Sequence, residues 1–125
     1  MPQYITNAGL AILANRLKGQ GDEPVYLAWG TGAAVADPAS TGISGEVGTR
    51  AVMVSQLETV TQVDDAYKLT GSISSLAVQT ITNWGVFDAP SGGNLLLIVS
   101  ENPGVDFQIG QLGAFTFRVQ FQRGD

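Results

Sequence analysis

The sequence contains no cysteine and no histidine. Without cysteine, the chain forms no disulfide and offers no thiolate nucleophile or thiolate metal ligand. Without histidine, it lacks the commonest general base near neutral pH and the commonest imidazole ligand of metals. Ser-His-Asp and Cys-His catalysis are therefore excluded.

Charge is also scarce. Charged residues make up 14% of the chain, compared with about 25% in typical globular domains, and the only lysines are Lys18 and Lys68. Because lysine is depleted where proteins bind one another, we expect neighbouring subunits to cover much of the surface. The alternative is a monomer kept soluble by hydroxyl and amide groups. The net charge of −5 includes no basic patch that would neutralise phosphates, so we expect no direct binding of nucleic acid.

Long hydrophobic runs are missing as well. No window approaches 18 uninterrupted apolar residues, and the first residues, MPQYITNAG, lack a basic segment followed by an apolar core. We therefore expect neither a secretion signal nor a membrane-spanning segment. The 125 residues are enough for one core, and we expect a single domain over residues 1–125.

The strongest pattern that is present lies between Thr80 and Val99. Two apolar runs flank the turn residues Ala89 to Asn94, which predicts a β-hairpin. The second run, Leu95 to Val99, is apolar at every position, so both arms are predicted to be buried. Other elements must then cover them.

One helix is predicted, from Thr6 to Leu17, with Leu10, Leu13, Ala14 and Leu17 on its apolar face. Thr6 or Asn7 is expected to cap it, and Gly19 and Gly21 to end it. Strands are predicted over Val25 to Trp29, Arg50 to Thr61, Tyr67 to Ser74 and Ala114 to Gln122, and long loops over Ala33 to Thr49 and Glu101 to Gly113.

The last of these strands has the clearest period of two. Phe115, Phe117, Val119 and Phe121 alternate with polar residues, so we expect this strand to be central to the core. The predicted fold is mainly β, an antiparallel, jelly-roll-like β-sandwich of about six strands with one short N-terminal α-helix.

Candidate chemistry is weak. Paired carboxylates among Asp37, Glu46, Asp64 and Asp65 would suit glycoside hydrolysis, but all four lie in predicted loops or turns, where Asp is common. Asp64 and Asp65 also lack the ligand spacing of an EF-hand. We expect no enzyme activity, no cofactor and no metal site.

Three short motifs have plainer explanations. Gly30-Thr31-Gly32 lacks the rest of a phosphate-binding loop and predicts a turn. The terminal Arg123-Gly124-Asp125 matches an integrin-type tripeptide, and three residues match too easily to carry weight. Trp29 and Trp84 would suit a sugar-stacking platform, although aromatic residues beside apolar ones are more often core or interface anchors.

Six segments occur in a characteristic order: Ile5 to Leu17, Tyr26 to Ala34, Glu46 to Arg50, Tyr67 to Ser74, Ile81 to Leu97 (ITNWGVFDAPSGGNLLL) and Ile109 to Phe121. Together they resemble small structural proteins of tailed bacteriophages, and their order is similar to that in the N-terminal module of phage tail-collar and tail-fibre proteins. A "GLFDA" hairpin recurs in those proteins. The chain ends directly after the last predicted strand, without the shaft or receptor-binding region of a fibre, which leads us to expect a self-contained virion part.

The resemblance implies a non-enzymatic protein of the virion, assembled in the cytoplasm of the bacterial host. Our first hypothesis is a capsid decoration (cement) protein that binds the major capsid protein as a symmetric homo-oligomer, for example a trimer. The alternative is a neck, collar or tail-fibre adaptor that binds other tail proteins, and a further alternative is a carbohydrate-binding module. The candidate interface residues are Tyr4, Ile5, Trp29, Asp37, Ile43, Glu46, Arg50, Trp84 and Phe107.

Overall fold

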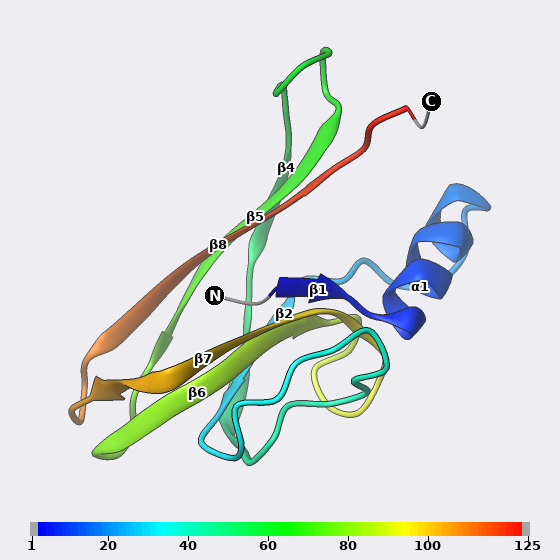
Figure 1. Cartoon of the computed structure of the whole chain (residues 1–125). Coiled ribbons are helices and arrows are strands. Elements are labelled where there is room, and N and C mark those ends of the chain that lie inside the picture. Colours follow the sequence, from blue (N-terminus) through cyan, green and yellow to red (C-terminus); the bar gives the residue numbers. More distant parts are fainter. Residues whose placement is uncertain (1–2, 124–125) are drawn as a thin grey trace.

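A computed structural model describes residues 3–123. It confirms a mainly β, antiparallel, sandwich-like fold with one short helix, but with eight strands instead of six (Figure 1). The elements are β1 (Gln3–Ile5), α1 (Asn7–Leu17), β2 (Tyr26–Gly30), β3 (Glu46–Val52), β4 (Val54–Glu58), β5 (Ala66–Ser74), β6 (Gln79–Phe87), β7 (Leu95–Phe107) and β8 (Leu112–Gln120).

The strands form two sheets. The larger sheet has the order β1-β7-β6-β2-β3, and the smaller has the order β4-β5-β8. The predicted hairpin is present as β6 and β7, which lie inside the larger sheet. Leu95 to Val99 are all at most 2% exposed. The expectation that both arms are buried is confirmed.

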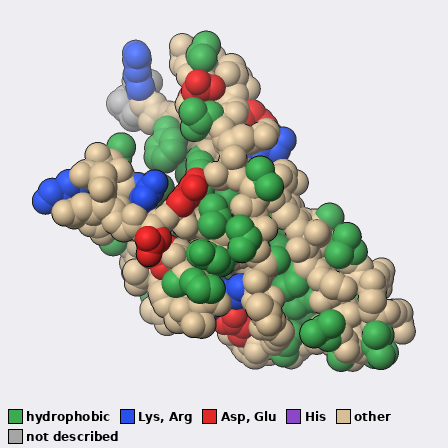
Figure 2. Space-filling model, turned by 180° about the vertical axis from the view of Figure 1, so that it is seen from behind, with side chains coloured by type: hydrophobic (Ala, Val, Ile, Leu, Met, Phe, Trp, Pro, Cys, Tyr) green, Lys and Arg blue, Asp and Glu red, His purple; other side chains and the backbone are tan. Residues whose placement is uncertain are grey.

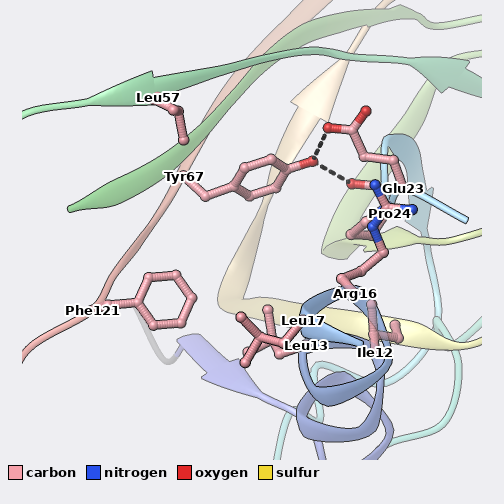
Figure 3. A pocket seen from close by; sticks show the side chains of 9 residues that line it. All are labelled: Ile12, Leu13, Arg16, Leu17, Glu23, Pro24, Leu57, Tyr67 and Phe121. Carbon is pink, nitrogen blue, oxygen red and sulfur yellow. Dashed lines mark hydrogen bonds between the residues drawn. The ribbon is translucent and has the colours of Figure 1, made fainter. Parts of the chain in front are cut away.

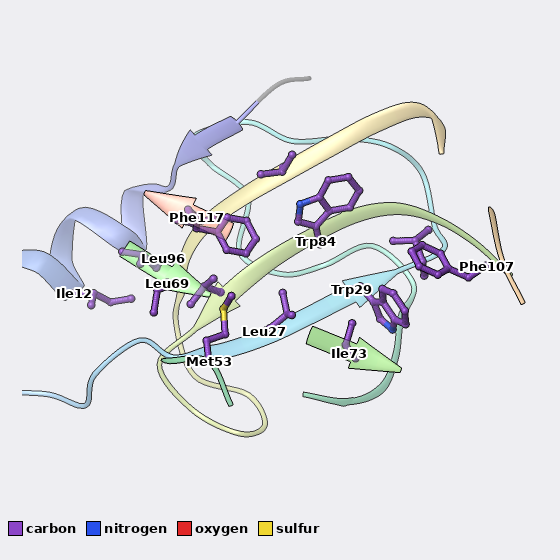
Figure 4. Packing of buried hydrophobic residues seen from close by; sticks show 14 residues of the cluster. Ile12, Leu27, Trp29, Met53, Leu69, Ile73, Trp84, Leu96, Phe107 and Phe117 are labelled. Atoms are coloured by element: carbon purple, nitrogen blue, oxygen red, sulfur yellow. The ribbon is translucent and has the colours of Figure 1, made fainter. Parts of the chain in front are cut away.

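The two sheets share a core between them (Figure 4). Trp29 of β2 packs edge-on against Phe107 at 5.0 Å and Phe115 at 6.2 Å between ring centroids. Trp84 of β6 lies 5.3 Å from the same Phe115. Aromatic contacts of this kind add to the stability gained from burial alone, so the two tryptophans fix one sheet against the other.

The chain crosses between the sheets at Met53, in the middle of what we predicted as one strand from Arg50 to Thr61. Met53 is 3% exposed, and its N–H donates to the carbonyl of Val25 at 2.7 Å. Burial of this one side chain turns the strand, so that β3 joins the larger sheet and β4 the smaller. The β-branched pattern continues across the corner, which is why the sequence does not reveal it.

The far face of the larger sheet is covered by residues 31–45. Ile43 packs there with Phe87, Leu95 and Ile98 in a second apolar cluster. The predicted loop therefore acts as a second cover for the sheet. It is also shorter than expected, because β3 already begins at Glu46.

Helix α1 begins as predicted at Thr6, whose hydroxyl accepts a hydrogen bond from Gly9 N at 2.9 Å and donates one to the carbonyl of Leu95. The predicted apolar face is wrong, because Leu10 is 60% and Leu17 is 90% exposed. The buried face instead carries Gly9 and Ile12. A Cβ at Gly9 would collide with the carbonyl oxygen of Leu96, so the close approach of helix to strand selects the face.

Strand β7 extends to Phe107, whereas a loop was predicted from Glu101 onward. Pairing with β6 resumes at Val105, opposite Ile81, after a shift of register. Pro103 and Gly104 lie within this irregularity, where proline is tolerated because no ladder hydrogen bond is required of it. The two residues that predict a loop are therefore held in a bulge.

We expected strand β8 to be central to the core. In the structure it lies at the edge of the smaller sheet. Phe117 is 3% exposed, Phe115 and Val119 are half-buried, and Phe121 is 54% exposed. The period of two is real, but the partner sheet covers only the middle of the strand.

The buried part of β8 makes a testable contribution to stability. Phe117→Ala should lower the free energy of unfolding by about 3 kcal/mol, because it leaves a cavity against Leu69 and the core. Chemical denaturation followed by the fluorescence of Trp29 and Trp84 measures this change. The matched control is Phe121→Ala, for which we expect a loss of less than about 1 kcal/mol. Equal losses for the two variants would contradict this burial.

The turn between β4 and β5 makes stability depend on pH. The carboxylate of Asp65 accepts hydrogen bonds from the N–H groups of Gln62, Val60 and Thr61, which lower its pKa from 3.8 to about 2. Its stabilising effect is therefore complete above about pH 4 and is lost as the pH falls toward 2.

Asp65→Asn should lower the melting temperature at pH 7, and the difference from the unmodified chain should shrink between pH 4 and pH 2. Thermal unfolding followed by circular dichroism tests this. The control is Asp64→Asn, which removes a charge from the same turn and keeps a residue type that tolerates the φ of 56° at that position. A difference that is constant with pH would contradict the role of the carboxylate.

Candidate interaction surfaces

Four of the nine candidate interface residues are buried in the core. Trp29, Ile43, Trp84 and Phe107 are between 1% and 8% exposed. Their side chains pack in the two apolar clusters described above. A sugar cannot stack on either tryptophan in this structure, because the chain's own core covers the rings.

Arg50 and Glu46, two further candidates, are brought together. The side chain of Arg50 is 7% exposed, and its Nε donates to Glu46 Oε2 at 2.8 Å. Its Nη1 donates to the carbonyls of Ala89 and Gly92, each at 2.8 Å, and its guanidinium lies 3.6 Å from the centre of the Phe87 ring. Arg50 therefore fastens the β6–β7 turn to β3.

The remaining three candidates lie on β1 and in the covering loop. Tyr4 is 38% exposed on the edge strand β1, and Ile5 is half-buried beside the core. Asp37 is exposed, and its Oδ1 accepts a hydrogen bond from Ala39 N at 2.8 Å within the covering loop. The nine residues therefore form no single patch.

Several carboxylates are engaged in contacts within the chain. Asp65 is occupied by three backbone N–H groups of its own turn. Glu58 pairs with Lys68 at 3.1 Å and also with Arg118, and these contacts, first that with Lys68, hold its pKa below the usual value. Within residues 3–123, no three acidic side chains gather in a way that could hold a metal ion.

An apolar groove of about 460 Å³ lies between α1 and the smaller sheet (Figure 3). Leu13 and Leu17 of the helix face Leu57, Tyr67 and Phe121 across it. At its rim the Tyr67 hydroxyl donates to Glu23 Oε2 at 3.0 Å. Burial, followed by this hydrogen bond, raises the pKa of Tyr67. The lining is mostly apolar, and its charged members are Arg16 and Glu23.

A second apolar surface lies at the end of the molecule where the β5–β6 and β7–β8 turns meet. The turns are joined by two backbone hydrogen bonds, from Ser75 N to the carbonyl of Gln111 and from Gly110 N to that of Ser75. Figure 2 shows hydrophobic side chains running down one face of the molecule toward an end without charged groups. The four large side chains of this apolar end are 60–79% exposed: Leu76, Val78, Ile109 and Leu112.

Neither surface was predicted from the sequence. The position of the groove depends on which face of α1 is buried. The spacing of the leucines in the sequence predicted the wrong face. The apolar end consists of single aliphatic residues in two turns distant in the sequence, without any shared period. The only available signal was the lack of charge in both turns.

In the part of the chain that the structure describes, no helix is both long and apolar enough to cross a membrane.

Replacement of Arg50 distinguishes a structural role from an interface role. Arg50→Ala should lower the free energy of unfolding by about 2 to 3 kcal/mol, since it leaves Glu46 and two turn carbonyls without their partner. Arg118→Ala is the control, for which we expect less than about 1 kcal/mol because its side chain is 47% exposed. An unchanged denaturation midpoint for Arg50→Ala would leave the arginine available to a neighbouring protein.

The comparisons with known proteins give one match. No curated protein and no solved structure showed significant similarity to the chain. The model of one family, described as podophage GP4 fiber I protein gp80, matches residues 3–110. This match includes α1 and strands β1 to β7 in full. It supports a phage structural protein related to tail fibres, as the resemblance implied, and makes the protein a component of a virion. The chain thus belongs to the family of the podophage GP4 fiber I protein gp80.

Proposed function

We propose that the protein is a non-enzymatic adaptor in the tail-fibre assembly of a podophage virion, where it binds other tail proteins. The observation that carries this proposal is the family match over residues 3–110. The family is one of phage fibre proteins, and the match spans nearly the whole sandwich. This favours the tail alternative over capsid decoration, for which the comparisons offer no support.

The use of the side chains agrees with a structural role. The aromatic rings of Trp29 and Trp84 are buried, Arg50 fastens a turn, and Asp65 caps another. The chain leaves apolar side chains exposed at the groove and at the apolar end. Exposed apolar patches of this kind mark sites of contact between proteins.

The mechanism is mass action. A protein that binds only the assembled tail stabilises that assembly by its own free energy of binding. No bond is made or broken, so the requirement is a rigid body with contact surfaces at fixed positions. The contacts of Trp29 and Trp84 with Phe115, which join the larger sheet to β8 of the smaller one, supply that rigidity. Assembly would take place in the cytoplasm of the bacterial host.

Copy number per virion tests this function. Quantitative mass spectrometry of purified virions should find a few copies, or a small multiple of the rotational symmetry of the tail, because closed assemblies of this kind are small rings. Immunogold labelling of the same virions should place the protein at the tail. Antibody binding to virions from which the tails have been removed is the control.

Hundreds of copies, with label distributed over the head, would overturn the tail assignment and support capsid decoration. Absence of the protein from purified virions would overturn both. Either result is independent of how the chain associates with itself.

A further inference from the structure

Four strands form the edges of the two sheets, and three of them are poor templates for another strand. β1 has three residues and β4 has five. β3 is interrupted by a shift of register against β2, and Gly48 within it has a φ of 74°. Short strands and bulges are the usual means by which proteins prevent pairing between edges.

β8 has none of these protections. It runs for nine residues from Leu112 to Gln120, pairs with β5 in an unbroken register, and contains no proline. Its only charged residue is Arg118, whose guanidinium is already paired with Glu58 of β4. A long, regular edge of this kind is a template for another strand.

The hydrogen bonds show which groups are free at this edge. Phe121 N donates to the carbonyl of Asp65, and Ser75 N to that of Gln111, so the odd-numbered positions near β8 bond toward β5. Because bonded and non-bonded pairs alternate along an antiparallel ladder, the even-numbered residues direct their N–H and C=O groups away from β5. Of these, Leu112, Ala114, Thr116 and Arg118 are exposed.

We propose that β8 pairs antiparallel with β8 of a second copy of this chain, about a two-fold axis at Thr116. The two smaller sheets then join into one continuous sheet, with three strands from each copy. This register pairs all nine residues of each strand, so that every outward N–H and C=O of β8 gains a partner.

The sequence around Thr116 is symmetric, which suits a two-fold axis. Phe115 and Phe117 flank it. In this register Phe115 of one copy lies opposite Phe117 of the partner subunit, on the core side of the sheet. Aromatic pairs opposite one another across strands are stabilising, as are pairs of threonines. Phe115 is half-buried in the single chain, and the pairing covers its remaining surface.

The charges are compatible with this register. Arg118 falls opposite Ala114 of the partner subunit, and the two arginines are four residues apart along the strands, roughly 13 Å. Screening by salt weakens repulsion beyond about 8 to 10 Å, and each arginine retains Glu58 of its own chain. The arrangement therefore places no like charges in contact.

Charge substitutions at the axis test the pairing and its register together. Light scattering with gel filtration should show a dimer at micromolar concentration for the unmodified chain. Thr116→Lys and Thr116→Glu should each weaken dimerisation by about tenfold or more, because each puts like charges directly opposite one another. An equimolar mixture of the two variants should restore the dimer, since lysine then faces glutamate.

The matched control is Ser72→Lys, on the same exposed face but on β5, where it pairs with Ala114 of β8 and so lies one strand away from the proposed contact. It should leave the dimer unchanged. Circular dichroism confirms that each variant folds. A monomeric unmodified chain, a trimer, or a dimer that neither Thr116 variant weakens would overturn the proposal.

A cysteine at the axis provides a second measurement. The chain has no cysteine of its own, so Thr116→Cys introduces a single thiol. Residues facing each other in a hydrogen-bonded pair have Cα atoms about 5.5 Å apart, within the range of roughly 4.4 to 6.8 Å that a disulfide spans. Mild oxidation should cross-link this variant into a dimer and leave Ser72→Cys monomeric on a denaturing gel. Equal cross-linking of the two would overturn the register.

Discussion

The fold depends on the need to cover both faces of the β6–β7 hairpin. Of the apolar residues from Leu95 to Val99, Leu97 and Val99 belong to the core between the sheets, whereas Leu95 and Ile98 belong to the second cluster, so hydrocarbon points in both directions. The smaller sheet covers one face, and residues 31–45 cover the other. These residues form no strand, although the N–H groups of Thr31 and Gly32 donate to the carbonyls of Gly45 and Ser44. Asn83 makes this possible, because its side chain is fully buried and bonds both backbone groups of Ser44, at 2.9 and 3.0 Å. The side-chain amide of Asn83 thus holds the covering loop to β6, where a ladder between strands would otherwise be needed.

This clamp also explains two glycines. A Cβ at Gly30 or Gly32 would collide with Ser44, so the chain can return close to β2 only where side chains are absent. The hydroxyl of Thr82 donates to the carbonyl of Gly32 at 2.6 Å and completes the contact. The covering loop is therefore held by its own chain, and the sheet beneath it remains dry without help from a neighbouring protein.

The sequence predicts the features that depend on a local pattern. It does not predict those that are set by a contact with a residue distant in the sequence. The hairpin, the cap at Thr6 and the period of β8 are local and were predicted correctly. The corner at Met53, the bulge at Pro103 and the buried face of α1 each depend on a backbone group of another strand: Val25, the β6 ladder and Leu96. A similar difficulty affects the choice of interface residues from sequence. Aromatic and ionic side chains that can anchor a partner can equally anchor the chain's own elements, as Trp29 and Arg50 do.

These constraints together leave β8 exposed. The helix, residues 31–45 and the smaller sheet all pack on the larger sheet, and within residues 3–123 no further strand pairs with the outer edge of β8. The strand cannot be shortened or bulged without loss, because Phe115 and Phe117 must reach Trp84 and Leu69 in the core. The same alternation that directs these rings inward directs the backbone groups of Ala114, Thr116 and Arg118 outward. The open edge of β8 is therefore a consequence of how the core is built. In a protein that works within a multi-chain assembly, such an edge can serve as a contact surface without any further segment of the chain.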